Sequence, residues 1–257
     1  MKPFSFRRMI TPCLCLALVL AGLFFFQKQT VPTSGKISSR KLPIYCVNTE
    51  SPKVSISFDA AWGNDDTATL LSILEKHHVK TTFFMTGGWV ESYPDDVKAI
   101  AAAGHDLGNH SENHKQMSTL SSEECKQEIQ KVHDKVKELT GQDMILFRPP
   151  YGDYNDTLID AANSLGYHVI QWDIDSLDWK DYGADNIVSR VLDNEHLGNG
   201  SIILMHNGAK YTKDALERVI TGLQEKGYEI VPISQLIYKE NYEMDHEGRQ
   251  SPVSNTQ

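Results

Sequence analysis

The sequence predicts an α/β fold in the form of a distorted (β/α)7-type barrel made by a single domain. Segments typical of strands and helices alternate along the chain in about seven units, and such alternation indicates a parallel sheet covered by helices. The chain has 257 residues, which is enough for one large domain with a substantial core. An open, doubly wound sheet would show the same alternation and remains the alternative.

Each expected strand is a short apolar or alternating run, and each expected helix carries an apolar stripe. The strands are expected at residues 54–58, 80–85, 105–109, 144–147, 167–172, 201–205 and 228–231. The helices are expected at residues 66–78, 94–104, 121–140, 156–165, 185–195 and 212–226, with a short helix after Pro232.

Capping residues mark several of the helix ends. Ser121-Ser-Glu-Glu124 forms a capping box, in which each end residue satisfies a backbone N–H of the first helical turn. Pro94 suits the first turn of a helix. Gly104 follows that helix and suits a C-terminal cap, because glycine readily adopts a left-handed backbone.

Residues 1–30 are expected to form a signal anchor that spans the membrane. Basic residues precede an apolar run from Met9 to Phe26; about 18 apolar residues are just enough to cross a bilayer. The basic flank favours a cytoplasmic N-terminus. The run ends in three phenylalanines instead of a small-residue cleavage site, which favours a single-pass protein of the cell membrane over a cleaved, secreted one.

The remaining boundaries follow from composition. Residues 31–41 are polar, with Pro32, Ser34 and Gly35, and are typical of a linker. Residues 42–240 are expected to be the folded domain, on the extracytoplasmic side. Residues 241–257 are polar and are expected to be a disordered tail.

Charge and cysteine content exclude some classes of function. The formal net charge of −9 argues against nucleic acid as a partner, because binding phosphates requires a basic surface. Two of the four cysteines lie in the N-terminal apolar run, and Cys46 and Cys125 lie far apart in sequence. A disulfide between Cys46 and Cys125 is left open, whereas a disulfide scaffold or a cysteine-type zinc site is not expected.

Polar or ionisable residues directly follow five of the expected strands. In parallel α/β folds the carboxyl ends of the strands meet at one edge, where chemistry is usually located. One such position is His110, and the His110-x-x-x-His114 spacing lets both imidazoles reach one metal ion. The five motifs are Ser57-Phe58-Asp59, His110-Ser-Glu-Asn-His114, Arg148-Pro-Pro-Tyr-Gly152, Asp175-Ser-Leu-Asp178-Trp179 and Ile203-Leu-Met-His206.

In this order, the five motifs resemble the polysaccharide deacetylases of carbohydrate esterase family four, the NodB-homology domain. The resemblance extends from about Lys53 to Ile237. It implies the glycoside hydrolase/deacetylase-like distorted barrel that the family adopts. The variant Phe58-Asp-Ala-Ala-Trp-Gly63 is most similar to the sporulation deacetylases of the PdaB type.

The resemblance implies roles for four catalytic residues. Asp59 matches the base that takes a proton from the attacking water, and Arg148 matches the residue that holds this base ionised. His206 matches the acid that protonates the leaving amine, and Asp178 matches the carboxylate that orients this histidine.

The resemblance also implies residues that contact the substrate. The backbone N–H of Tyr151 matches a donor to the oxyanion of the tetrahedral intermediate. Trp179 and Leu204 match the walls of the groove that holds the acetyl group and the sugar. We expect Trp62 at the rim of this site, where its indole could stack on a sugar ring.

By the same resemblance, His110 and His114 are ligands of a divalent metal, Zn²⁺ or a similar ion. The family's usual third ligand is an aspartate directly after the catalytic base, and this chain has Ala60 there. Asp65 could supply a third ligand instead. Asp66 more simply opens a helix, where a carboxylate is favoured. The expected metal is therefore bound weakly, through two histidines, or is absent.

The resulting hypothesis is an extracytoplasmic deacetylase that hydrolyses the N-acetyl groups of GlcNAc or MurNAc residues in peptidoglycan, in the spore cortex if the PdaB likeness holds. One alternative is a catalytically weakened glycan-binding protein of the wall or spore, because of Ala60. Another is a metal-independent amidase that uses Asp59 and His206 alone. The sequence leaves the sugar, the metal and the oligomeric state open.

Overall fold

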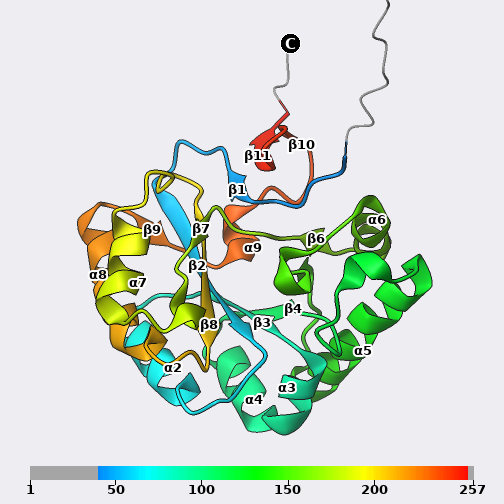
Figure 1. Cartoon of the computed structure of the whole chain (residues 1–257), viewed down its shortest axis with the longest axis horizontal. Coiled ribbons are helices and arrows are strands. Elements are labelled where there is room, and N and C mark those ends of the chain that lie inside the picture. Colours follow the sequence, from blue (N-terminus) through cyan, green and yellow to red (C-terminus); the bar gives the residue numbers. More distant parts are fainter. Residues whose placement is uncertain (1–39, 254–257) are drawn as a thin grey trace, which may run out of the picture. The chain divides into compact units, whose positions relative to one another are not determined.

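The computed structural model describes residues 40–253. Its centre is a curled parallel sheet with the strand order β6-β5-β4-β3-β2-β8-β7, and β9 pairs with the start of β2 (Figure 1). This half-barrel confirms the predicted (β/α)7-type fold. The strands are β2 (Lys53–Ala60), β3 (Thr82–Met85), β4 (Asp106–Asn109), β5 (Leu146–Phe147), β6 (His168–Val169), β7 (Ile174–Asp175), β8 (Ile202–Asn207) and β9 (Glu229–Ile230).

Helices surround the outer side of the curled sheet (Figure 1). Apart from α3, they lie close to the expected helical stretches. They are α2 (Thr67–Lys76), α3 (Gly87–Ser92), α4 (Pro94–Ala102), α5 (Ser122–Thr140), α6 (Asp156–Ser164), α7 (Ala184–Leu192), α8 (Thr212–Glu225) and α9 (Ile233–Leu236). Three short 3₁₀ turns are η1 (Met117–Thr119), η2 (Pro150–Gly152) and η3 (Asp178–Lys180).

The capping signals act as predicted in α5. The Ser121 side chain accepts from the Glu124 backbone N–H, and the Glu124 carboxylate accepts from the Ser121 backbone N–H. Gly141 ends the helix with a left-handed backbone (φ 73°). The helix begins and ends at residues whose backbone groups are satisfied, so its register against the sheet is fixed locally.

Strand β2 is the centre of the core. It is buried on both faces from Val54 to Ala60, as expected for a parallel strand with neighbours on both sides and helices outside. Ser57 and Asp59 are nevertheless part of it. A buried carboxylate at such a position requires charged or hydrogen-bonding partners, and the strand thereby places Asp59 at the edge where the functional site forms.

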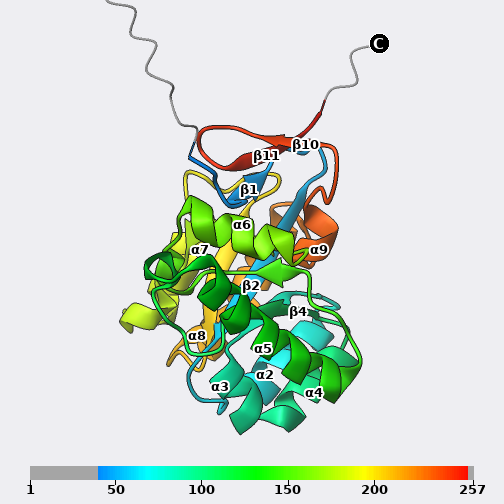
Figure 2. The same cartoon turned by 90° about the vertical axis from the view of Figure 1, so that its right-hand side faces the viewer.

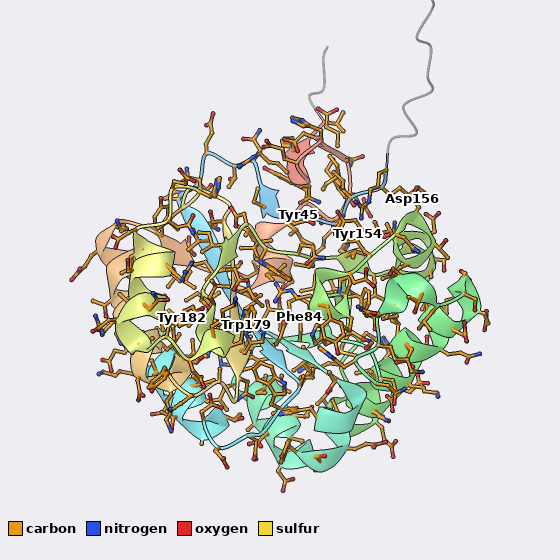
Figure 3. The ribbon with its side chains drawn as sticks, in the orientation of Figure 1. Tyr45, Phe84, Tyr154, Asp156, Trp179 and Tyr182 are labelled. Atoms are coloured by element: carbon orange, nitrogen blue, oxygen red, sulfur yellow. The ribbon has the colours of Figure 1, made fainter. Side chains whose placement is uncertain are left out.

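The N-terminal part of the described chain links the end of β6 to the residues just before β8. The Ile44 N–H donates to the Val169 carbonyl at the end of β6, and the Gln171 N–H donates to the Ile44 carbonyl. The Val47 N–H donates to the Gly200 carbonyl at 3.0 Å. Tyr45 also bonds Tyr154 through their hydroxyls at 3.2 Å, near the start of α6 (Figure 3). Cys46 and Cys125 are both buried and free, so they do not form a disulfide.

The C-terminal segment corrects one prediction. Residues 242–252, which we expected to lie in a disordered tail, form the hairpin of β10 (Tyr242–Met244) and β11 (Arg249–Pro252), and β11 pairs in parallel with β1 (Cys46–Val47) (Figure 2). The turn is held by Asp245, whose carboxylate accepts two backbone N–H groups at 2.9 Å. The polar composition therefore marks a turn and an edge hairpin instead of disorder.

The predicted localisation at the cell membrane is also corrected. Within residues 40–253, no helix is both long and apolar enough to cross a bilayer. The span that we expected over residues 1–30 lies outside the described residues.

Candidate active site

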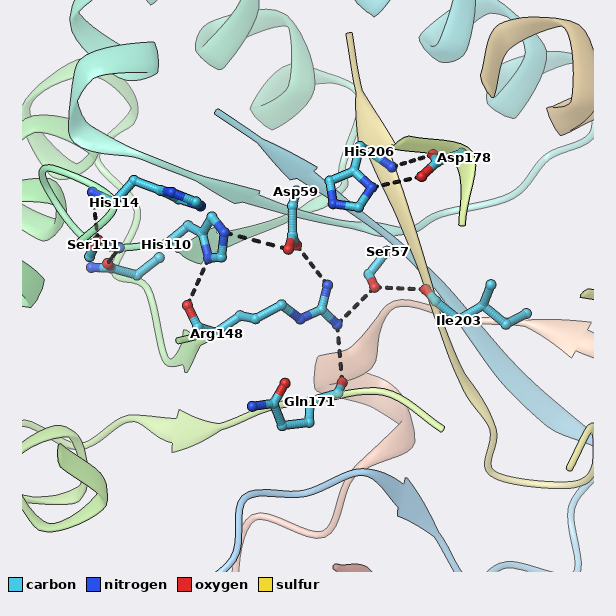
Figure 4. Close-up of polar contacts among 11 residues, drawn as sticks. Ser57, Asp59, His110, Ser111, His114, Arg148, Gln171, Asp178, Ile203 and His206 are labelled. Carbon is cyan, nitrogen blue, oxygen red and sulfur yellow. Dashed lines mark hydrogen bonds and ion pairs between the residues drawn. The ribbon is translucent and has the colours of Figure 1, made fainter. Parts of the chain in front are cut away.

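A pocket of about 470 Å³ opens at the carboxyl ends of the central strands, the usual location of chemistry in parallel α/β folds. Most of the predicted site residues meet there. Those that line it are Asp59, Trp62, His110, His114, Tyr151, Trp179, Leu204 and His206. Arg148 and Asp178 do not line the pocket but contact Asp59 and His206, respectively (Figure 4).

Asp59 is held by the guanidinium of Arg148. Arg148 Nη1 donates to Asp59 Oδ1 at 2.7 Å, and its Nη2 donates to Ser57 Oγ at 2.9 Å and to the Gln171 carbonyl at 3.2 Å (Figure 4). Arg148 is fully buried, and its guanidinium carbon lies 4.1 Å from the ring centre of Phe84. The charge is thus distributed over a carboxylate, two oxygen acceptors and an aromatic face.

These contacts control the ionisation of Asp59. Burial raises the pKa of its carboxyl, but the charge of Arg148, together with His110 and His206, outweighs burial and leaves the pKa below its usual value. Asp59 is therefore an ionised carboxylate at neutral pH and can accept a proton in the pocket.

His206 is paired with a carboxylate, whereas Asp59 is paired with a cation. Its Nδ1 lies 2.7 Å from Asp178 Oδ1, and Asp178 is fully buried. Burial alone would lower the pKa of His206, but the hydrogen bond and charge of Asp178, with Asp59 and Asp175, raise it above the usual value. Because Asp178 occupies Nδ1, the Nε2–H of the imidazolium is the group available to donate a proton.

The two predicted ligand histidines are held by the loop after β4. The Nδ1 of His110 lies 2.7 Å from the Arg148 carbonyl, so this nitrogen carries the hydrogen. His114 has a left-handed backbone (φ 51°), and its N–H donates to Ser111 Oγ at 3.1 Å. The two rings lie edge to face with centres 4.9 Å apart. The sequence thus brings both imidazoles into one pocket through a strained, hydrogen-bonded loop.

The charge state of His110 indicates what its second nitrogen can hold. Burial lowers the pKa of His110 to about 4, so the ring is neutral at neutral pH and Nε2 carries a lone pair. This Nε2 lies 3.5 Å from Asp59 Oδ2. A lone pair facing an ionised carboxylate is stabilised by a cation between them, so the donor chemistry at this point suits a metal ion.

The complete ligand set fits a metal only in part. Ala60 carries no donor, and Asp65, the predicted substitute, is exposed and is absent from the pocket lining. Among residues 40–253, no group of three or more His, Cys, Asp or Glu side chains is placed to hold a metal ion. The structure therefore brings two imidazoles to a candidate site and leaves the third protein ligand unfilled.

The substrate side of the pocket is aromatic. Trp179, from η3 and labelled in Figure 3, is 47% exposed, and Leu204 of β8 is buried beneath the pocket. Tyr151 has a left-handed backbone (φ 61°) and its ring lies edge to face on His114, with centres 4.5 Å apart. Exposed and half-exposed rings above an apolar floor suit a sugar ring and the methyl of an acetyl group.

Sequence reasoning assigned no role to several residues of this site. Asp175 and Trp172 line the pocket, and burial raises the pKa of Asp175. Thr212 Oγ1 donates to Asp178 Oδ2 at 2.6 Å. Ser57 could have been found, because it lies two residues before Asp59 and alternate residues of a strand share one face. Thr212 lies on a distant helix, and no pattern in the sequence marks it.

An ionised carboxylate and a carboxylate-supported imidazole face one pocket, an arrangement that suits acid–base catalysis. Residues 47–170 match the family described as Polysaccharide deacetylase. YlxY of Bacillus subtilis is 34% identical over 209 residues, 81% of this chain and 65% of YlxY. The peptidoglycan-N-acetylmuramic acid deacetylase PdaA of Bacillus subtilis is 30% identical over 203 residues, 76% of this chain and 75% of PdaA. The chain belongs to the polysaccharide deacetylase family, hydrolases that act on amide bonds.

Similar solved structures include both an inactive and a reactivated protein. Wild-type BA3943 of Bacillus anthracis, described as a CE4 family pseudoenzyme, is 35% identical with a TM-score of 0.74 over 77% of this chain and 69% of that chain. A BA3943 mutant with restored enzymatic activity is 36% identical with a TM-score of 0.73 over 77% of this chain and 72% of that chain. The shared CE4 fold is therefore compatible with both states.

Proposed function

We propose that the chain removes N-acetyl groups from amino-sugar residues of peptidoglycan. The proposal rests on two ionisable groups that face the same pocket and whose pKa values are shifted in opposite directions. The pKa of Asp59 is lowered beside Arg148, which keeps its carboxylate ionised, whereas Asp178 raises the pKa of His206 and favours its protonated form. Amide hydrolysis requires a base for the attacking water and an acid for the leaving amine, both near the operating pH.

The protein's own residues account for the proton transfers. A water molecule attacks the acetyl carbonyl carbon and gives a proton to Asp59. His206 then donates its proton to the amide nitrogen, so that the C–N bond breaks and acetic acid, which ionises to acetate in solution, leaves with a free amine. Asp59 returns its proton to solvent and His206 takes up another one. We expect the Tyr151 N–H to donate to the oxyanion between these steps.

A divalent metal, when bound, would polarise the acetyl carbonyl and acidify the attacking water. Deacetylases of this family generally depend on a metal. In this chain His110 and His114 would hold it, since burial lowers the pKa of both rings and keeps them neutral. With Ala60 beside Asp59, we expect this binding to be weak.

Relatives support the substrate class. PdaA is named for deacetylation of peptidoglycan N-acetylmuramic acid, and the half-exposed Trp179 and the buried Leu204 suit an N-acetylated sugar. Both N-acetylglucosamine and N-acetylmuramic acid fit this argument. A role in the spore cortex stays a prediction that rests on the likeness of Phe58-Asp-Ala-Ala-Trp-Gly63 to sporulation deacetylases.

The direct test is acetate release by the purified full chain from peptidoglycan and from an N-acetylglucosamine oligomer, with Zn²⁺, Co²⁺ or Mn²⁺ supplied. Asp59→Asn and His206→Ala should each reduce the rate by at least about 100-fold. Asp95→Asn is a matched control, because its side chain is 98% exposed and pairs only with Lys98 within the described residues. Absence of acetate with both substrates and every metal would overturn the enzymatic proposal.

A second function is favoured by Ala60 together with the similarity to the pseudoenzyme BA3943. The chain would then bind peptidoglycan without deacetylating it. Retention on insoluble peptidoglycan that is unchanged in His110→Ala, without acetate release, would select this function. Acetate release that persists in excess chelator would instead select a metal-independent amidase working through Asp59 and His206.

A further inference from the structure

Trp62 stacks on the imidazole of His206. The two ring centres are 5.1 Å apart and the ring planes are inclined by only 20°. Trp62 is 49% exposed and lies at the rim of the pocket, on the loop between β2 and α2. One face of its indole therefore covers His206, so this face cannot also stack on a sugar.

The loop that carries Trp62 is tied down at three points. The Gly63 carbonyl accepts from the indole N–H of Trp89 at 3.3 Å, and Asn64 Nδ2 donates to Asp96 Oδ2 at 2.6 Å. The third tie is Asp66, whose Oδ1 accepts from the Gly208 N–H at 2.9 Å and from the side-chain amide of Asn207. Connecting loops are usually more mobile than the elements they join. These hydrogen bonds therefore restrict the conformation of the loop that carries Trp62.

The Asp66 tie joins this loop to the end of the strand that carries His206. Asp66 is 4% exposed and, although it precedes α2, its side chain does not cap that helix. Thr67 Oγ1 donates to Asn207 Oδ1 at 3.0 Å, so Asn207 is held from both sides. A Cβ atom at Gly208 would come within 3.0 Å of the Gly63 carbonyl oxygen, which shows how closely the two backbones approach.

We infer that Trp62 is a positioning residue for His206: its indole holds the imidazole against Asp178 and favours the protonated ring. This inference rests on the proposed function, in which His206 is the acid. A cation above an indole face is attracted by the ring's quadrupole, and a wall on one side removes alternative orientations of the imidazole. Asp66 supports this positioning of His206, because its hydrogen bonds fix the loop that carries Trp62.

Other charged groups also face His206, and their effects must be separated from that of Trp62. Asp178 of η3, Asp59 of β2 and Asp175 of β7 favour the imidazolium. His114, from the loop after β4, opposes it when protonated, but burial lowers the pKa of His114 and keeps it neutral. Replacing Trp62 leaves all four groups in place, so a change in His206 would report on the indole.

The test compares Trp62→Leu and Trp62→Phe in the full chain. The pKa of His206 is measured by NMR of its imidazole, and acetate release is measured across pH. Trp62→Leu should lower the pKa of His206 by about 0.5 to 1, a roughly three- to tenfold loss of proton affinity, and move the alkaline limb of kcat by the same amount. Trp62→Phe, which keeps an aromatic face, should retain most of the wild-type value.

Tyr182→Leu is the control. It removes an exposed aromatic ring from the segment after η3, outside the pocket lining. It should leave the pKa of His206 unchanged. A Trp62→Leu variant that folds with an unchanged His206 pKa and only a raised KM would overturn the inference in favour of sugar stacking. The NMR measurement needs no turnover, so it tests the role of Trp62 by itself. A wild-type chain without acetate release would instead overturn the proposed function.

Discussion

His206 donates two hydrogen bonds to one carboxylate. Its backbone N–H reaches Asp178 Oδ2 at 2.7 Å and its Nδ1 reaches Asp178 Oδ1 at 2.7 Å. Since Asp178 is fully buried and also accepts from Thr212 Oγ1, the carboxylate cannot rotate without breaking several bonds. The relationship fixes both the orientation of the imidazole and the nitrogen that keeps the proton.

Asp178→Asn should therefore lower the pKa of His206 by about 1 or more, because the group that raises this pKa against burial loses its charge. His206 has a raised pKa in the folded state, so its protonation contributes stability that is present below the unfolded pKa of about 6.5 and is lost as pH rises through the folded value. The alkaline limb of acetate release should move to lower pH in the variant.

The same variant should lose unfolding free energy more strongly at pH 5.5 than at pH 9, measured by urea denaturation. Asp181→Asn provides the control, since Asp181 is exposed on the same segment and already has a left-handed backbone that asparagine tolerates. An alkaline limb that is the same in Asp178→Asn and wild type would contradict the role assigned to this carboxylate.

Arg148→Met should lower the unfolding free energy by about 3–5 kcal/mol, because it leaves Asp59 as a buried carboxylate without its main partner. Adding Asp59→Asn removes the uncompensated charge, so the double variant should lose less than the sum of the single losses. Chemical denaturation of the four proteins measures this coupling. Additive losses would mean that Arg148 acts through Phe84 and Ser57 alone.

Much of the site could be predicted from the sequence, because the sequence pattern indicates where the strands end. An apolar run followed by Asp59, His110 or His206 places those side chains at one edge of a parallel sheet, and the structure confirms that they share a pocket. Asp65 and Asp66 were harder to separate. They are adjacent carboxylates, yet one is exposed and the other is buried against Asn207, which depends on contacts with the distant β8.

Two conformations were not predicted from the sequence pattern: the stacking of Trp62 and the β10–β11 hairpin. The indole of Trp62 could equally well have faced a sugar, and its stacking on His206 follows from long-range ties of the loop. The β10–β11 hairpin is too polar to resemble a buried strand, because its edge position requires only Gln250 to be fully buried. In both cases, contacts distant in sequence decide the outcome.

Asp173→Asn tests a partly buried carboxyl outside the Asp59–Arg148 and Asp178–His206 pairs. Burial raises the pKa of Asp173 to about 6, although its carboxylate accepts from the Ile202 N–H at 2.7 Å and Ser201 Oγ at 3.0 Å. With a raised folded-state pKa, its contribution to stability is present below the unfolded pKa of about 3.9 and is lost as pH rises through about 6.

Asparagine has nearly the same shape and remains neutral at every pH, so Asp173→Asn should gain stability relative to wild type as pH increases from 4 to about 7. Thermal unfolding of both proteins over this range measures the difference. The exposed Asp160→Asn, whose partner is Lys41, should show no comparable trend. A constant difference between Asp173→Asn and wild type would mean that the carboxyl titrates at its ordinary pKa.

Ala60→Asp tests whether position 60 limits the metal site. Ala60 ends β2 directly after Asp59, and its carbonyl is already used by the Thr86 N–H at 3.1 Å. A carboxylate there would add a third ligand to His110 and His114, so the affinity for Zn²⁺ measured by calorimetry should rise by about tenfold or more. Ala60→Asn has the same size without the charge and should gain less, whereas adding His114→Ala should remove the gain. Equal Zn²⁺ affinities in wild type and a folded Ala60→Asp variant would show that the missing ligand does not limit the site.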